Sequence, residues 1–470
     1  MNEPAAGDER AGNPRQQFWL WAAANNNPFI ISSGVLVAGL GLSWPKAAAA
    51  VVVGVAISYP FVGIVAVAGL RGGAPTLLLS RATFGHVGNK LPTFIALISC
   101  IGWEAVALFL AATATRTLVH RVDPDAESAV LLTCGLLVTG TVTVLVALCG
   151  YRLIVRAQRW ITIAIVAAIV GYGVLVVEEV GFPASNLSSG DTPLVAGIAF
   201  VAAAGGLSWV VMGADYSRHL ASESAPFAVA GWTTLGGALA PVTLMLFGVF
   251  LSTARSDVVA AASVDPLGAI TLPLPTWFCI PFLMTTIVGL VGSGVINLYS
   301  SGLNLRALGI GLSHSGAIVF NAIFVLVGTC YLLFISPSFF GTFQTFLTLL
   351  GVVIAAWCSV FVADFLLHRR RGYEGGSGAS NPNGLVRVDG ASLSALVLAA
   401  CIGLAVNTAG DPRVLRTIDW FVDPRFLRAV GSMRAGIFVS LVSGAAIYAL
   451  LVKGRAVFRS AERRRPAGSP

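Results

Sequence analysis

The amino-acid sequence predicts an all-α polytopic membrane protein with twelve transmembrane helices, and three observations support this fold class. Of the 470 residues, 56% are hydrophobic and only 11% are charged, a composition that excludes an ordinary water-soluble protein of this length. Apolar windows of roughly 20 residues, the length that crosses a hydrocarbon core about 30 Å thick, occur twelve times. The first and the sixth of these windows also contain residues that break a helix.

The twelve windows follow one another through most of the chain. Residues 1–17 are polar and lack the basic start and short apolar run of a signal peptide, so we expect a disordered cytoplasmic tail there. Residues 368–389 predict a flexible cytoplasmic linker, and residues 453–470 predict a basic cytoplasmic tail. The first ten expected spans are 18–43, 47–70, 92–117, 128–149, 159–178, 193–214, 226–252, 274–300, 314–335 and 339–367. A final pair, 390–407 and 431–452, lies in the segment 390–452.

The positive charges set the expected orientation. When the N-terminus is placed inside, most of the 29 Lys and Arg residues fall on the inner side, as the positive-inside rule requires. Both termini are therefore expected to be cytoplasmic, in an inner or plasma membrane. The net charge of +8 does not indicate a nucleic-acid partner, because no basic face interleaved with aromatic residues accompanies it.

The first window, 18–43, is broken near its middle. Asn25, Asn26 and Asn27 are followed by Pro28. Polar side chains and a proline inside an apolar span are costly unless they face a cavity. The pattern therefore predicts a discontinuous first helix.

The sixth window, 193–214, is interrupted by Gly205 and Gly206, with Ser208 and Trp209 just after them. Glycines in a membrane helix more often allow close helix packing, so this break alone is weak evidence. The first window, however, is broken at the corresponding place. Paired breaks indicate two five-helix repeats, 18–178 and 193–367, with a substrate site between them.

Several stretches together resemble one family, the nucleobase–cation symporters, and within it the purine–cytosine permease branch. The resemblance covers the first ten helices in the right order. It rests on residues 21–25 (WAAAN), 71–75 (RGGAP), 80–88 (SRATFGHVG), 101–104 (IGWE), 208–209 (SW), 213–218 (GADYSR) and 297–303 (NLYSSGL).

The resemblance implies a leucine-transporter-like fold, with two inverted five-helix repeats and two extra helices. It also implies alternating-access uptake of a nucleobase together with a cation. By position, Trp103 matches the aromatic residue that stacks on the substrate, and Asn297 matches the asparagine that hydrogen-bonds its edge. Some relatives carry a second aromatic residue where this chain has Gly206; here Trp209 supplies it instead. Gly206 and Trp209 are therefore both expected to lie in the substrate site.

The chemistry of a nucleobase fits these residues independently of the family. A nucleobase is a flat ring system rimmed with hydrogen-bond donors and acceptors, so it needs an aromatic face for stacking. It also needs side chains that both donate and accept, which Asn25, Ser208 and Asn297 provide. Packing of Trp103 against lipid or core, and an interhelical hydrogen bond from Asn297, are the competing structural explanations.

Glu104 is the most unusual residue of the expected spans. A carboxylate within a membrane span costs on the order of 3 kcal/mol, and such residues usually face a cavity or a proton pathway. Two functional roles are open to Glu104, carriage of a coupling proton and acceptance of hydrogen bonds from the substrate. A structural pair with another polar side chain is the third possibility. Because successive helical residues point about 100° apart, Glu104 and Trp103 cannot both face the cavity squarely.

The coupling ion is expected to be a proton rather than sodium. Sodium-coupled relatives use hydroxyls of the eighth helix as ion ligands, and the positions aligned with them are Val288, Val291 and Gly292. These offer no hydroxyl, although Ser293 is adjacent and a shift of one residue would restore one. Hard cations need several oxygen ligands, so sodium is disfavoured if the register holds.

The sequence thus predicts a secondary transporter in the lipid bilayer that imports cytosine or purines by proton symport. The alternative is the same fold importing hydantoin, allantoin, uracil or hydroxymethylpyrimidine, possibly with sodium. An ion channel or a non-transporting sensor is the alternative of another class. No enzyme activity, metal or cofactor is expected, because no catalytic or metal-ligand constellation is visible; the oligomeric state is not predicted. Asp215 and Asp364, near span ends, are expected to form boundary or gating ion pairs.

Overall fold

The computed structural model describes residues 10, 12–149, 151–180, 193–373, 386–409 and 424–463. Within these ranges the chain is almost entirely helical, and its β-structure is limited to one isolated bridge between Gly12 and Leu220. Eleven helices of the described residues are long and apolar enough to cross a membrane, and Phe29–Ala38 is a shorter apolar helix. The all-α membrane fold expected from composition is confirmed.

The first half of the helical core begins with two short helices in place of one. These are α1 (Arg15–Asn25) and α2 (Phe29–Ala38), and the residues between them include Pro28, which lies outside both helices. The break expected at the asparagines is therefore confirmed. The remaining helices of this half are α3 (Trp44–Gly72), the short α4 (Thr76–Phe84), α5 (Lys90–His120), α6 (Ser128–Cys149) and α7 (Tyr151–Val180).

The second half also begins with a broken helix, as expected. Helix α8 (Leu194–Ala204) ends at Gly205, and α9 (Gly206–Trp209), η2 (Val210–Met212) and α10 (Gly213–Ser217) continue the span. The following helices are α11 (Pro226–Ala254), the short α12 (Ser256–Ala262) and α13 (Pro266–Ile270), α14 (Thr276–Ala307), α15 (His314–Cys330) with η3 (Tyr331–Ile335), and α16 (Phe339–Asp364) with η4 (Phe365–Arg369).

The last helices are α17 (Gly390–Thr408), the short α19 (Pro424–Ser432) and α20 (Gly436–Arg463). Helix α20 continues past residue 452, where the twelfth span was expected to end. Most of the expected N-terminal tail, most of the expected linker and the end of the basic tail lie outside the described residues.

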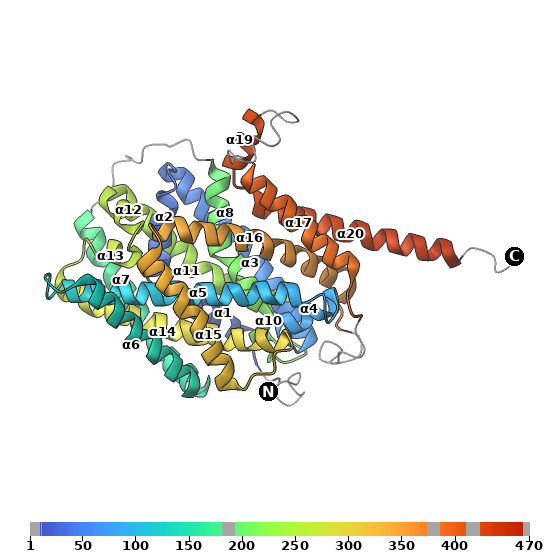
Figure 1. Cartoon of the computed structure of the whole chain (residues 1–470), viewed down its shortest axis with the longest axis horizontal. Helices are drawn as coiled ribbons and strands as arrows, with labels where there is room; N and C mark the ends of the chain where they lie inside the picture. The colour runs from blue at the N-terminus through green and yellow to red at the C-terminus, as the bar shows by residue number, and fades with distance from the viewer. Residues whose placement is uncertain are drawn as a thin grey trace.

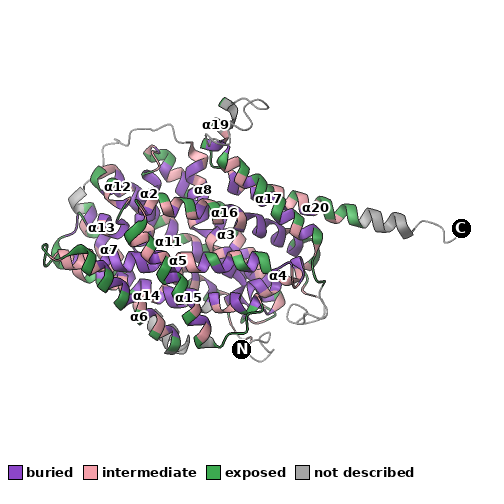
Figure 2. Cartoon of the chain, in the orientation of Figure 1, coloured by how far each residue is buried: buried purple, intermediate pink, exposed green. Residues whose placement is uncertain are grey.

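The broken helices lie in the centre of the molecule. In the span from Leu194 to Ser217, 72% of the most apolar window is buried, against 22% for α6 and 17% for α7. Figure 2 shows the same contrast between the buried central helices and the exposed outer faces of α6 and α20. Apolar side chains such as Leu137 and Val170 are exposed on the outer helices, as is expected for a surface that contacts lipid.

Helices α2 and α11 cross in backbone contact. A methyl group on Gly34 would overlap the backbone of Met245, and one on Gly248 would overlap the backbone of Ile31. Small residues at such crossings let membrane helices approach closely. This contact fixes the half of the first span that follows the break.

The two ends of the helix bundle carry different short helices. Helices α12 and α13 lie at one end and α4 at the other (Figure 1), and we call these ends the α13 side and the α4 side. The N-terminal segment is held beside the end of α10, because the Gly12 N–H donates to the His219 carbonyl at 3.1 Å and Ala221 donates to the Gly12 carbonyl at 3.0 Å.

Candidate functional site

The two helix breaks meet through the side chain of Asn25. Its Oδ1 accepts hydrogen bonds from the Tyr59 hydroxyl at 2.7 Å and from the Trp209 Nε1 at 3.0 Å. Its Nδ2 donates to the Trp21 carbonyl at 2.9 Å. Asn25 therefore joins the end of α1 to α3 and to the broken sixth span. It lines the cavity between the breaks, but most of its hydrogen-bonding capacity is used within the protein.

Gly206 lies against α3 and not in the cavity wall. Its N–H, released by the helix break, donates to Ser58 Oγ at 3.2 Å. A side chain at this position would overlap the Ser58 backbone. This placement does not support the substrate contact expected at Gly206, because the residue packs closely against α3; its neighbours Gly205 and Ser208 line the cavity.

The cavity encloses about 780 Å³ of space free of protein atoms, part of it open to the outside. Its wall is formed by the broken first span (α1 and α2), by α5, by the broken sixth span and by α14. Helices α3 and α11 also contribute residues. Its aromatic and polar lining side chains are Asn25, Asn27, Phe29, Ser33, Tyr59, Trp103, Ser208, Trp209, Ser293 and Asn297. The structure thus brings Asn25, Trp103, Ser208, Trp209 and Asn297 together as the sequence predicts.

Trp103 is held in the wall by rings of α16. Its indole makes edge-to-face contacts with Phe343 and Phe346, with centroids 5.6 and 6.1 Å apart. Phe343 also contacts Phe29 of α2 at 5.7 Å and stacks on Phe339 at 5.3 Å. Such aromatic contacts fix ring orientation, so Trp103 is a positioned flat surface beside the cavity.

Glu104 is buried, but it is not part of the cavity wall. Its Oε1 lies 3.9 Å from the point that a β-carbon on Gly294 would occupy, and Thr143 of α6 approaches the same point. Glu104 thus faces α6 and α14 while Trp103 faces the cavity, as their 100° separation on the helix requires. Its Oε2 has no hydrogen-bond partner among the described residues. This placement does not support direct contact with a substrate.

Five of these aromatic and polar residues were not predicted to line a substrate cavity: Asn27, Phe29, Ser33, Tyr59 and Ser293. Tyr59 lies within the long apolar α3, and nothing in its local sequence indicates a role. Asn27 belongs to the asparagine triplet in which only Asn25 was singled out as a site residue. Ser293 precedes Asn297 by four residues on α14, so helical periodicity would place it on the same face.

A comparison with known protein families decides the class of this chain. Residues 4–424 match the family model described as permease for cytosine/purines, uracil, thiamine, allantoin. The chain belongs to this family. It is a transporter of the nucleobase–cation symporter type and not an enzyme.

Two curated relatives have low sequence identity to this chain. The putative purine-cytosine permease YxlA of Bacillus subtilis is 24% identical over 377 residues, which cover 78% of this chain and 79% of that protein. The purine-cytosine permease FCY2 of Saccharomyces cerevisiae is 22% identical over 392 residues, covering 78% and 70%.

Solved structures support the fold. The permease matches Mhp1, a nucleobase-cation-symport-1 family transporter, in a closed conformation with bromovinylhydantoin bound, with a TM-score of 0.70, 16% identity and 96% and 95% coverage of the two chains. Inward-facing Mhp1 also gives 0.70, at 99% and 98% coverage. The leucine-transporter-like fold expected from the resemblance is confirmed.

On the α4 side of the permease, helix α4 is hydrogen-bonded to three spans. The Thr76 backbone N–H and hydroxyl both donate to Asp215 at the end of the sixth span, at 2.9 Å. Trp357 of α16 donates to Ser80 Oγ at 3.0 Å, and Arg81 donates to the Ala307 carbonyl of α14 at 2.7 Å. These contacts hold α4 across the end of the bundle.

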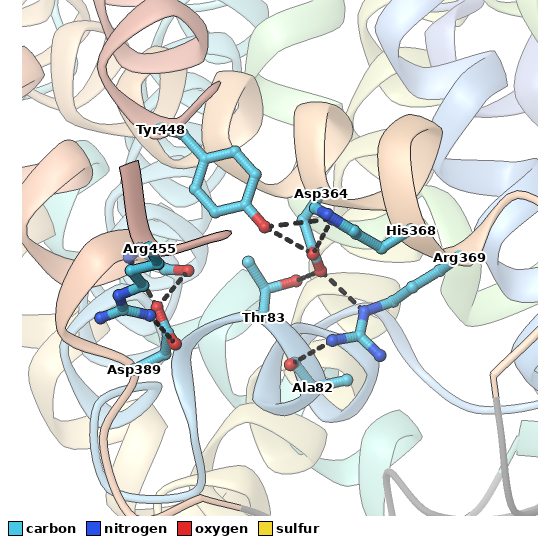
Figure 3. Close-up of polar contacts among 9 residues, drawn as sticks. Ala82, Thr83, Asp364, His368, Arg369, Asp389, Tyr448 and Arg455 are labelled. Atoms are coloured by element: carbon cyan, nitrogen blue, oxygen red, sulfur yellow. Dashed lines mark hydrogen bonds and ion pairs between the residues drawn. The ribbon is translucent and has the colours of Figure 1, made fainter. Parts of the chain in front are cut away.

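Asp364 is the centre of a polar cluster on the same side (Figure 3). Its carboxylate accepts from Thr83 of α4, from Arg369 of η4 and from Tyr448 of α20, each at 2.7 Å, and His368 lies 3.2 Å away. The ion pair expected for Asp364 near a span end is confirmed with Arg369. The cluster joins α20, one of the two extra helices, to α4.

Asp389 and Arg455 form a second pair beside this cluster, 2.8 Å apart. Asp389 also caps α17 by accepting from the Ser392 N–H at 2.8 Å. Burial alone would raise the pKa of Asp389, but the hydrogen bonds from Ser392 and Arg455 lower it below its ordinary value. This pair is more exposed than that of Asp364, so it is expected to contribute less.

Proposed function

We propose that this permease imports a nucleobase, cytosine or a purine, by proton symport and alternating access. The observation that carries the proposal is the cavity between the two helix breaks, which combines the indole of Trp103 with the carboxamide of Asn297. The membrane is an inner or plasma membrane, with both termini and the α4 side cytoplasmic. This orientation rests on the distribution of Lys and Arg.

The lining of the cavity suits a flat polar heterocycle. Stacking on an aromatic side chain contributes about 1–3 kcal/mol per base, and the Asn297 carboxamide offers both a donor and an acceptor. Two curated relatives carry purine–cytosine permease names. The family description also includes uracil, thiamine and allantoin, so another small heterocycle is the alternative substrate.

Proton coupling is assigned to Glu104. A buried carboxylate oxygen without a hydrogen-bond donor is unfavourable when charged, and protonation removes that charge. Glu104 of α5 faces α6 and α14 and lies next to Gly294, on the helix that also carries Asn297. Protonation there can alter the packing of α14. Sodium coupling is the alternative, and the presence of the Ser293 hydroxyl in the cavity wall favours it.

The test is uptake of radiolabelled cytosine into cells that lack their own nucleobase permeases. Uptake is measured at acidic and mildly alkaline pH, with and without sodium, and with unlabelled adenine, hypoxanthine, guanine, uracil, hydantoin, allantoin and hydroxymethylpyrimidine as competitors. Saturable uptake that rises at acidic pH, ignores sodium and is inhibited by purines is expected. Absence of cytosine uptake, with transport of another compound, would refute the substrate assignment, and sodium dependence would refute proton coupling.

A further inference from the structure

A second cavity lies on the α4 side, where the two extra helices meet the core. It encloses about 770 Å³ of space free of protein atoms, part of it open to the outside. Its wall comes from α4, from the end of α16 with η4, from the start of α17 and from α20, and it contains the Asp364–Arg369 and Asp389–Arg455 ion pairs (Figure 3). It shares no lining residue with the substrate cavity, so it is a separate site.

The two carboxylates of this second cavity are already occupied by donors of the protein. Asp364 accepts three hydrogen bonds of 2.7 Å, from side chains of α4, η4 and α20. Asp389 accepts from the N–H and the hydroxyl of Ser392 at 2.8 and 3.0 Å and from Arg455 at 2.8 Å. The second cavity therefore offers little free carboxylate to bind a cation.

The two guanidinium groups, by contrast, keep unused donors. An arginine side chain carries several N–H donors and no acceptor. Arg455 donates to Asp389 from Nη1, and Arg369 donates to Asp364 from Nε and to the Ala82 carbonyl from Nη2. The other N–H groups of both side chains have no acceptor among the described residues. Because the planar guanidinium matches the geometry of phosphate, the free capacity of this cavity suits a phosphate group.

The surroundings of the second cavity favour a lipid as the source of that phosphate. Exposed basic side chains occur on the same elements or just beside them, at Arg370, Arg371, Arg387 and Lys453. Leu366 and Leu367 of η4 are 47% and 60% exposed, and Leu451 of α20 is 38% exposed. A basic pocket next to exposed apolar side chains can bind an acidic headgroup while the acyl chains contact the leucines.

We propose that this second cavity binds the phosphate group of an anionic phospholipid in the leaflet on the α4 side, with Arg369 and Arg455 as hydrogen-bond donors. The bound lipid connects α20 to η4 at the junction that also holds α4. This site goes beyond the transport function, and it does not depend on which heterocycle the permease carries.

The experiment measures binding of fluorescently labelled phosphatidylglycerol to the purified full-length permease in neutral detergent micelles. Unlabelled phosphatidylglycerol, phosphatidylcholine and inorganic phosphate are the competitors. Arg455→Gln is compared with Lys453→Gln, which removes the same charge from the same helix at an exposed residue outside the cavity wall. Arg455→Gln should weaken binding about tenfold, because charge-assisted hydrogen bonds are lost. Lys453→Gln should weaken it by about twofold at most.

Three results would overturn the proposal. Equal weakening in the two variants would show general attraction between charges, and absence of saturable binding would show that no site exists. Displacement by phosphatidylcholine or inorganic phosphate as effective as that by phosphatidylglycerol would refute the assignment to an anionic lipid.

A second variant covers the case in which Arg455→Gln does not fold. Arg455→Lys keeps the positive charge but loses the planar pair of donors, so it should still weaken binding several-fold, and unchanged binding in it would overturn the proposal. These readouts do not involve transport. Failure of the proposed function would therefore leave them unchanged.

Discussion

Asn25 links the two broken helices through three hydrogen bonds, so its main role in this structure is to position them. Replacing Asn25 with Ala leaves the Tyr59 hydroxyl and the Trp209 indole N–H without their acceptor, and each unpaired group costs about 1–3 kcal/mol. Purified Asn25→Ala should therefore unfold at a clearly lower temperature than the unmodified permease. Tyr59→Phe, which removes one donor and leaves Asn25 intact, should have a smaller effect. Equal melting temperatures for Asn25→Ala and the unmodified permease would contradict this assignment.

Glu104 provides a second test at the level of one residue. Gln has nearly the same shape as the protonated acid but cannot release a proton, so Glu104→Gln should remove the rise of uptake at acidic pH. The measurement is the pH profile of saturable uptake, with surface expression as the control for folding. A profile that keeps its acid dependence would exclude Glu104 as the proton carrier.

Single residues also show which parts of the site could be predicted. Trp103, Asn297 and the asparagine triplet stand out because large aromatic and amide side chains are conspicuous in apolar spans. Helical geometry predicts that Glu104 points away from Trp103. It does not predict which helices Glu104 contacts, because these depend on tertiary packing. The position of Tyr59 at the cavity and the contact of Gly206 with Ser58 depend on how α3 packs against the sixth span. The local sequence does not indicate that packing.

Among the elements, the broken spans were predictable because proline and paired glycines interrupt a helix for local reasons. The packing of α2 on α11 was not, because it depends on two glycines more than 200 residues apart. Gly248→Ala should sharply reduce the yield of folded permease, since its methyl group would overlap the Ile31 backbone. The matched change Gly231→Ala, also in α11, meets no atom within 4 Å and should be neutral or slightly stabilising. Similar yields and melting temperatures for both variants would contradict this packing.

Helix α4 closes one end of the bundle through long-range contacts that the sequence did not indicate. Asp364→Asn removes the charge that holds Thr83, Arg369 and Tyr448 together, and the α4 side should then open more often. A cysteine placed at the buried Ser300, in a chain without its other cysteines, should react several-fold faster with a membrane-impermeant thiol reagent applied from the α4 side. Asp389→Asn is the control, because its pair with Arg455 is more exposed and an asparagine still caps α17. Equal labelling rates in the two variants would show that Asp364 does not hold α4 closed.

At the scale of the whole molecule, composition and the two breaks were enough to predict the class of fold, because a membrane permits few backbone arrangements. The outer helices expose apolar side chains to lipid, and the polar groups gather where the broken helices meet in the centre. The choice of substrate depends on the placement of a few donors and acceptors in the cavity wall, which helix periodicity alone does not give.

The central claim is that the cavity between the two breaks binds a nucleobase against Trp103. Its most direct test is equilibrium binding of radiolabelled cytosine and adenine to the purified permease and to Trp103→Ala. Trp277→Ala is the matched control, since Trp277 is 68% exposed on the outside of α14. We predict saturable binding to the unmodified permease and the control, and binding about tenfold or more weaker in Trp103→Ala, because stacking contributes about 1–3 kcal/mol. Undiminished binding in Trp103→Ala, or no nucleobase binding by the unmodified permease, would contradict the account.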